Sequence, residues 1–260
     1  MNKAMSAILQ TENLAVAIGG KSVCAGLDMA LTRGACLGIL GMNGIGKTTL
    51  LLTLAGLRKA DSGNLTIDGK PLEDWRGREL ARVRGLMPQD THDAFPLTVL
   101  EAALAGRHPY QSSWGWESRA DMALAREALA CVDLAALEER DCATLSGGER
   151  RRLALATLLA QSPQLYLLDE PVNHLDPHHQ ILLLDLIAQE CRTHSRTAVM
   201  TLHEPNLAAR YCSHVLLLYG NGEARYGTRE ALLTAENLSR LYCHRMLAHE
   251  MAEGMCFLPA

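Results

Sequence analysis

Short runs of apolar residues recur along the chain and alternate with longer stretches of helical periodicity. An uninterrupted apolar run of this kind is typical of a strand that is buried on both faces, as in a parallel sheet. Strands that alternate with helices predict an α/β fold with a largely parallel sheet. We expect buried strands at residues 36–40, 83–87, 165–169, 198–202 and 214–219.

Two other regions show different patterns. Near the N-terminus, the segments "LQTENLAVAI" and "NLTIDG" indicate half-exposed antiparallel strands. Between about residue 95 and residue 160 no strand pattern is convincing, and the periodicity indicates helices at 98–107, 119–132 and 147–161. We therefore expect one domain over residues 1–260, with an N-terminal antiparallel β subdomain and an inserted helical subdomain at about 91–160.

Composition excludes some classes of function. The chain has 260 residues and a formal net charge of −4, so no basic field supports binding to nucleic acid. Apolar runs stay well below the roughly 20 residues that a membrane-spanning helix needs. The N-terminal segment "MNKAMSAILQTENL" lacks the apolar core of a secretory signal, because polar residues interrupt it. We expect a soluble chain that stays in the cytoplasm.

The cysteines and histidines are scattered. Eight cysteines include no C-x-x-C pair, which with no export signal argues against a disulfide framework and favours small buried side chains. His178 and His179 are neighbours in the sequence. Adjacent residues of a helix point to different faces, which argues against a metal site there.

The segment "GMNGIGKTT" fits the phosphate-binding pattern G-x-x-x-x-G-K-[ST]. It follows the expected strand 36–40 and opens a helix, so backbone N–H groups and the helix N-terminus can hold phosphate oxygens. Lys47 would reach the β- and γ-phosphates, and the Thr48 hydroxyl would bind Mg²⁺. The nucleotide contacts expected in this loop are Gly41, Asn43, Gly44, Gly46, Lys47, Thr48 and Thr49.

Two carboxylates end the expected strand "LYLLDE". The carboxyl ends of parallel strands face the ligand crevice of such a sheet. Asp169 is suited to hold Mg²⁺, and Glu170 is then placed to polarise a water molecule towards the γ-phosphate. The alternative is a strand capped by acids for solubility.

A second glycine-rich helix start occurs at "LSGGERRRLALATLLA". Ser146 and Glu149 have the spacing of a capping box, which alone could explain the local sequence. Gly147 and Gly148, however, are poor residues for the first turn of a helix and leave its N–H groups accessible. The segment therefore also suits a second phosphate contact.

The segment "LSGGE" followed by "LYLLDEPVNHLD" resembles the signature and catalytic segments of ATP-binding cassette (ABC) proteins. The resemblance covers essentially the whole chain and implies a P-loop NTPase (RecA-like) core that uses ATP and Mg²⁺. It also implies a head-to-tail homodimer, in which ATP lies between the P-loop of one cassette and residues Ser146, Gly147 and Gly148 of the other. The family pattern places Gln89 beside Mg²⁺ and the attacking water, Asp176 at the cassette interface and His203 at the γ-phosphate.

Two further segments indicate which group of ABC proteins the chain resembles. "FPLTVLEAALAGRHPY" and "GTREALLTAENLSRLY" resemble segments of importers for iron–siderophore, haem and cobalamin. This likeness implies two integral-membrane permease subunits, an extracytoplasmic substrate-binding protein, and a peripheral position on the cytoplasmic face of the inner membrane. The alternative is a soluble ABC ATPase in a scaffold such as one for iron–sulfur cluster assembly.

Aromatic residues raise two questions. Tyr110, Trp114 and Trp116 form a cluster in a chain with only 4% aromatic residues. The resemblance places them beside the groove for the membrane subunit, so they are either interface anchors or the packing of the subdomain's own core. Ile18 stands where cassettes usually carry an aromatic ring that stacks on adenine.

Overall fold

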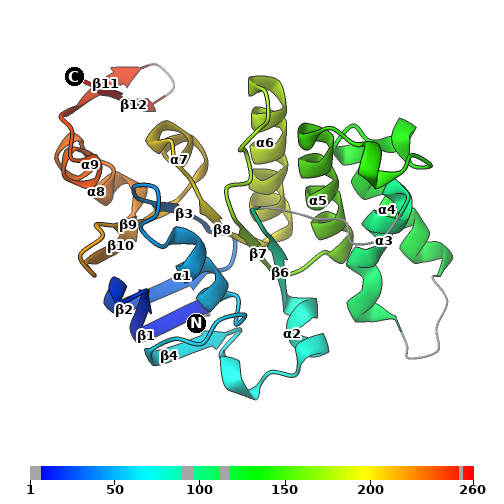
Figure 1. Ribbon diagram of the computed structural model, residues 1–260, viewed down its shortest axis with the longest axis horizontal. Coiled ribbons are helices and arrows are strands. Elements are labelled where there is room, and N and C mark those ends of the chain that lie inside the picture. Colours follow the sequence, from blue (N-terminus) through cyan, green and yellow to red (C-terminus); the bar gives the residue numbers. More distant parts are fainter. Residues whose placement is uncertain (1–6, 90–96, 112–117, 252–253) are drawn as a thin grey trace, which may run out of the picture.

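The computed structural model describes residues 7–89, 97–111, 118–251 and 254–260. Trp114 and Trp116 lie outside the described residues, so their expected role is not addressed by the structure. The fold is that expected from the sequence: a mainly parallel sheet, a separate antiparallel sheet, and a group of helices at one end of the molecule (Figure 1).

The antiparallel sheet holds the N-terminal strands. Its strand order is β2-β1-β4-β5. The two segments that the sequence indicated form β1 and β4, whereas β2 was not expected. Alternation in β2 is interrupted around Gly26, which has a φ of 69°, a conformation that favours glycine. The strands are β1 (Ala7–Ile18), β2 (Lys21–Thr32), β4 (Ser62–Ile67) and β5 (Lys70–Pro71).

The central sheet has six strands in the order β10-β9-β3-β8-β7-β6. All neighbours from β9 to β6 pair in parallel, and β10 pairs antiparallel with β9. The five expected strands are confirmed, with ends that differ by one residue at most. They are β3 (Cys36–Leu40), β6 (Arg84–Met87), β7 (Leu165–Leu168), β8 (Thr197–Thr201) and β9 (His214–Leu218), joined by β10 (Ala224–Thr228).

Helices cover the two sheets, and a short hairpin ends the chain. Figure 1 shows α1 between the two sheets and α6 on the other side of the central sheet. The helices outside the helical region are α1 (Lys47–Leu54), the 3₁₀ turn η1 (Leu72–Asp74), α2 (Gly77–Val83), α6 (Pro177–His194), α7 (Pro205–Tyr211), α8 (Arg229–Leu232) and α9 (Ala235–Tyr242). The hairpin consists of β11 (Met246–Met251) and β12 (Gly254–Pro259) and was not expected.

The first helix of the helical region starts at Val99, one residue after the start that the sequence indicated. Capping boxes start three of its helices, at Thr98, Ser118 and Ser146. The helix expected at 98–107 ends earlier and continues as a 3₁₀ helix that contains Pro109, whose ring clashes with an α-helical carbonyl. The bounds of about 91–160 for a subdomain stay a prediction. The elements are α3 (Val99–Leu104), η2 (Ala105–Tyr110), α4 (Arg119–Cys131), η3 (Ala135–Leu137), η4 (Cys142–Thr144) and α5 (Gly147–Gln161).

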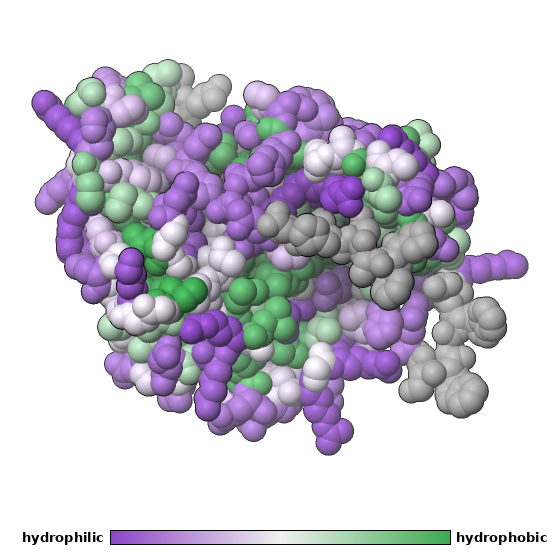
Figure 2. Space-filling view, in the orientation of Figure 1, coloured by the Kyte–Doolittle hydropathy of each residue, from purple (hydrophilic) through white to green (hydrophobic). Residues whose placement is uncertain are grey.

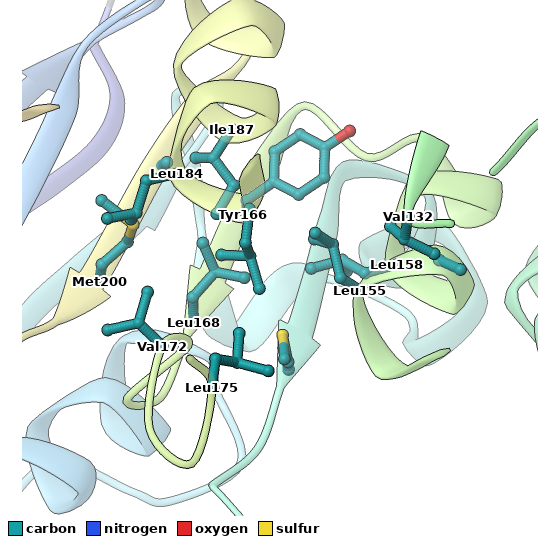
Figure 3. Close-up of a cluster of buried hydrophobic side chains, with 14 of the residues drawn as sticks. Val132, Leu155, Leu158, Tyr166, Leu168, Val172, Leu175, Leu184, Ile187 and Met200 are labelled. Carbon is teal, nitrogen blue, oxygen red and sulfur yellow. The ribbon is translucent and has the colours of Figure 1, made fainter. Parts of the chain in front are cut away.

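Two apolar clusters form the core. One fills the space between the antiparallel sheet, α1 and the near face of the central sheet. The other joins the far face of the central sheet to α6 and to the helical region. Figure 3 shows part of it, where Tyr166 of β7 lies between Leu155 and Leu158 of α5 and Ile187 of α6. The shared packing ties the helical region to the strand that carries the acidic residues.

The face shown in Figure 2 is mostly hydrophilic, with apolar residues gathered near its centre. Five cysteines are buried, as expected, whereas Cys131 and Cys243 are exposed and Cys256 is intermediate. The expectation of burial was therefore wrong for part of the set; both exposed thiols lie at helix ends, where little packs over them. In the part of the chain that the structure describes, no helix combines the length and hydropathy that a bilayer span requires.

Candidate nucleotide-binding site

The phosphate-binding loop connects β3 to α1. Gly46 is the N-cap of α1 and has a φ of 105°. A Cβ at this position would lie 2.4 Å from Cγ2 of Val23, so side chains other than hydrogen are excluded. The loop backbone can therefore reach the helix start without a side chain in the way. A helix N-terminus of this kind attracts anions through its N–H groups and its dipole.

Lys47 lies in the floor of the loop. Its side chain is buried, and Nζ donates to the carbonyl oxygens of Gly41 at 2.9 Å and Met42 at 3.2 Å. Burial lowers the pKa of this ammonium group, and the carboxylates of Glu170 and Asp169 act in the opposite direction. A desolvated cation held among acceptors is suited to bind phosphate oxygens, which would replace the carbonyl contacts.

Asp169 is fixed at the end of β7 by a threonine of the neighbouring strand. The Thr201 hydroxyl, at the end of β8, donates to Oδ1 of Asp169 at 2.7 Å. The same hydroxyl accepts from the backbone N–H of Glu170 at 2.7 Å. Asp169 is only 3% exposed, so its carboxylate is held rigidly behind the loop. A single hydroxyl thus sets the position of both acidic residues.

Three polar side chains surround the Glu170 carboxylate. Nε2 of His203 lies 2.6 Å from Oε1, and Nε2 of Gln89 donates to Oε2 at 2.9 Å. The Asn173 amide also donates to Oε2. Glu170 has a φ of 48°, which a non-glycine residue rarely adopts and which is found at functional sites. The structure therefore brings together the three residues that the sequence assigned to catalysis.

These groups face one cavity of about 600 Å³. The loop and the acidic edge line it together, and Ile18 lies on its rim with 49% of its surface exposed. Gly41 and Asp169 stand behind the lining, in contact with Lys47 and Thr201 respectively. The lining residues are Ile18, Asn43, Gly44, Gly46, Lys47, Thr48, Thr49, Gln89, Glu170, Asn173 and His203.

The predicted metal ligands have the chemistry that Mg²⁺ prefers. Thr48 offers a hydroxyl, Asp169 a carboxylate and Gln89 an amide oxygen, and Mg²⁺ takes oxygen ligands together with phosphates and water. The Gln89 amide nitrogen is engaged with Glu170, which leaves its oxygen for a cation. The donor set therefore fits Mg²⁺ with a nucleotide phosphate, and the assignment of these three ligands stays a prediction.

The second glycine-rich segment lies outside this cavity. Oγ of Ser146 accepts from the N–H of Glu149 at 3.2 Å, and the Glu149 carboxylate accepts from the N–H of Ser146 at 2.7 Å. The capping box is therefore present. A Cβ on Gly147 would meet nothing within 4 Å, so the helix start is open to an approaching molecule.

Asp176 also lies apart from the cavity and caps α6. Its Oδ1 accepts from the N–H of His179 at 3.0 Å. Hydrogen bonds from the His179 side chain and, to a lesser extent, from its backbone N–H lower the pKa of the Asp176 carboxyl. Within the described part of one chain, the structure thus does not bring Ser146, Gly147, Gly148 or Asp176 to the P-loop cavity.

Arg151 links the helical region to the catalytic edge and was not singled out from the sequence. It is 7% exposed. Its guanidinium donates to the carbonyls of Pro88 and Gln89, both at 2.7 Å, and also to those of Asp169, Glu170 and Pro171. The first turns of α5 are therefore hydrogen-bonded to two backbone segments, the one that follows β6 and the one that follows β7.

Two more contacts of the site were not predicted from the sequence. Asn173 holds the Glu170 carboxylate, and Thr201 holds Asp169. A signal for Thr201 was present, because it ends a buried strand next to the one that ends in "DE", and parallel strand ends meet at one edge. For Asn173 and Arg151, the pattern of residues gave no comparable signal.

The fold and the site together define a P-loop nucleotide-binding protein whose cavity includes the Glu170 carboxylate. Residues 24–173 match the family described as ABC transporter. The hemin import ATP-binding protein HmuV of Pseudomonas fluorescens is 39% identical over 95% of this chain and 96% of its own length. The petrobactin import ATP-binding protein FpuD of Bacillus anthracis is 36% identical over 82% of this chain and 78% of its own.

Solved structures agree with this likeness. An inward-facing conformation of a metal-chelate type ABC transporter matches with a TM-score of 0.85 and 29% identity over 98% of both chains. A dimeric post-hydrolysis ATP-binding cassette with ADP and phosphate matches with a TM-score of 0.73 and 25% identity, over 85% of this chain and 98% of that one. The chain belongs to the ABC transporter family, and it is an ATP-hydrolysing cassette of that family.

Proposed function

We propose that this chain hydrolyses ATP to power a membrane importer for an iron–siderophore complex, haem or cobalamin. The observation that carries the hydrolytic step is the Glu170 carboxylate, held by His203, Gln89 and Asn173 at the mouth of the P-loop cavity. The import direction and the class of cargo are supported by relatives named for hemin and petrobactin import.

The chemistry assigned to the residues follows from their positions. Lys47 and the loop amides would hold the phosphates, while Glu170 would accept the proton of the attacking water. His203 lines the same cavity, and its Nε2, which contacts Glu170 here, would donate to the γ-phosphate when the nucleotide is bound. Mg²⁺, held by Thr48, Gln89 and Asp169, would neutralise phosphate charge when the nucleotide is bound.

Hydrolysis on this proposal needs a second cassette. The open helix start at Ser146, Gly147 and Gly148 lies outside the cavity of its own chain, and Asp176 does too. In a head-to-tail homodimer, each chain would supply this second phosphate contact to its partner. The solved structure of a dimeric ATP-binding cassette supports pairing of two cassettes.

The importer would require partners that this chain does not contain. We assign two integral-membrane permease subunits, an extracytoplasmic substrate-binding protein and a peripheral position on the cytoplasmic face of the inner membrane. Relatives named as import ATP-binding proteins support these partners. Trp114 and Trp116 are candidates for contact with the permease, and their replacement by alanine should weaken that association while basal ATP hydrolysis remains.

The proposal is tested by growth of a strain that lacks this chain. Cells are supplied with haem, a ferric siderophore or cobalamin as the limiting nutrient, and are complemented with the wild type or with Glu170→Gln. Wild-type rescue on one of these nutrients, without rescue by the variant, is the expected result. A general loss of iron–sulfur enzyme activity with unchanged uptake of all three would instead favour the scaffold ATPase.

A further inference from the structure

Three side chains of the metal-binding type meet outside the nucleotide cavity. They are Asp133, which follows α4, and His178 and His179 in the first turn of α6. Their ligand atoms all lie within 4.8 Å of one another. The expectation that the two histidines diverge was wrong, because their rings meet edge to face with centroids 5.2 Å apart. In the first turn of a helix, adjacent side chains can still swing towards a common point.

The backbone that carries Asp133 is fixed. Val132 is buried against Leu155 and Leu158 of α5, as Figure 3 shows. Arg152 donates to the carbonyls of Val132 at 2.8 Å and Asp133 at 3.0 Å. The turn that presents Asp133 is therefore anchored, while its carboxylate remains exposed.

A fourth residue orients one of the histidines. Nδ1 of His179 lies 2.6 Å from Oδ2 of Asp176. Its second nitrogen, Nε2, is consequently the one available to a metal ion. Metal-binding histidines commonly place their other nitrogen against a carboxylate, which fixes the ring and strengthens the ligand. Asp176 and His179 already have this arrangement.

We propose that Asp133, His178 and His179 form a binding site for a divalent first-row transition metal, with Zn²⁺ as the best fit. Two imidazoles and one carboxylate are a ligand set that Zn²⁺ uses, with water in the fourth position. Bonds of about 2.0–2.1 Å place tetrahedral ligands about 3.4 Å apart, so the side chains need only close around the ion. Imidazole nitrogens disfavour Mg²⁺ and Ca²⁺, which prefer oxygen.

A bound ion would join two parts of the molecule. Asp133 belongs to the helical region, whereas both histidines belong to the helix that Asp176 caps. The site is separate from the P-loop cavity and shares none of its lining residues. Metal binding can therefore be measured independently of nucleotide binding and of the proposed transport function.

The experiment titrates the untagged full chain with Zn²⁺ in competition with a chromophoric chelator, without nucleotide. We expect one tight equivalent per chain. Asp133→Asn, His178→Ala and His179→Ala should each weaken binding at least about tenfold, because even carboxylates behind the ligands change metal affinity by about 10–100-fold. Asp176→Asn retains a good helix cap but loses the carboxylate, and should weaken binding by about tenfold.

Matched controls exclude other ligands. His194→Ala removes an exposed histidine at the far end of α6, and Cys131→Ser removes the exposed thiol two residues before Asp133. Both should bind Zn²⁺ like the wild type, and the Co²⁺ complex should lack a thiolate charge-transfer band. Equal affinity in the wild type and the three ligand variants overturns the proposal, as does a thiolate band that disappears in Cys131→Ser.

Discussion

The starts of α1 and α5 are both rich in glycine, but the free N–H groups of their first turns have different hydrogen-bond partners. The N-cap of α1 is Gly46, which has no side chain to offer, and the helix start lies in the cavity. The N-cap of α5 is Ser146, which forms a reciprocal capping box with Glu149. One helix start is left to a ligand, and the other is partly satisfied by its own residues.

The capping box at Ser146 leaves hydrogen-bonding capacity that a phosphate could use. The Ser146 hydroxyl accepts one hydrogen bond in the box and keeps its hydrogen and a second lone pair. It can therefore cap α5 in its own chain and donate to a phosphate held by another chain. The start of α1 lines a cavity within its own chain, whereas the start of α5 would act only after dimerisation.

The largest effect is expected for Glu170→Gln, which tests the chemistry beside the α1 start. The variant should bind ATP as the wild type does, because Lys47 and the loop are unchanged. Its hydrolysis rate should fall by about 10²–10⁴-fold, the usual contribution of a general base. ATP should convert it to a stable dimer in size-exclusion chromatography, and hydrolysis at the wild-type rate would refute the role of Glu170.

The next effect concerns the α5 start and uses Ser146→Asp. Aspartate caps a helix about as well as serine, so the free energy of unfolding should stay within about 0.5 kcal/mol of the wild type. Placed in the Glu170→Gln background, it should weaken the ATP-induced dimer at least about tenfold, since facing like charges cost several kcal/mol. Sedimentation measures the dimer. Unchanged dimerisation would mean that this helix start does not meet phosphate.

A smaller effect is expected at the rim of the cavity. Ile18 lines the cavity but offers no π-face to a base. Ile18→Tyr should tighten ATP binding by up to about tenfold, because stacking on an aromatic side chain contributes about 1–3 kcal/mol and 1.4 kcal/mol is one decade. Titration with ATP and GTP tests this, with Ile18→Leu as the control. An unchanged affinity would show that another residue already covers the base.

The smallest effect separates the cap from the phosphate contact. Ser146→Ala removes the oxygen that accepts from Glu149, which should lower the free energy of unfolding by about 1 kcal/mol. ATP binding to the monomer should not change, because the α1 start is intact. Chemical denaturation of Ser146→Ala beside Ser146→Asp provides the measurement, and equal stability of the two would argue against the box.

The sequence predicted five of the six strands of the central sheet because most of them are short apolar runs, whereas β10 is only partly buried and was missed. The prediction of elements failed where a single residue interrupts the local pattern. Alternation breaks around Gly26 in β2, and Pro109 turns the end of an expected α-helix into a 3₁₀ helix. The C-terminal hairpin was missed because most of its residues are exposed and give no burial pattern.

The site was predictable where residues lie in one loop or at one strand end. The structure groups Lys47, Glu170 and His203 at one cavity, as their motifs indicated. The carbonyl contacts of Arg151 were not predictable, since they join α5 to two loops far along the chain. Such contacts depend on how helices pack on the sheet, which periodicity does not specify.

The order of strands determines how firmly each residue of the site is held in the sheet. The P-loop follows β3, His203 follows β8, the two acidic residues follow β7, and Gln89 follows β6 at the edge of the sheet. With strands about 4.8 Å apart, the edge lies about 14 Å from the P-loop strand. Among the strands that the structure describes, β6 pairs with β7 alone, so a pull on it shears one ladder rather than two. Gln89 thus follows an edge strand, and Arg151 of α5 holds its carbonyl, so a displacement of the helical region would be transmitted to Gln89.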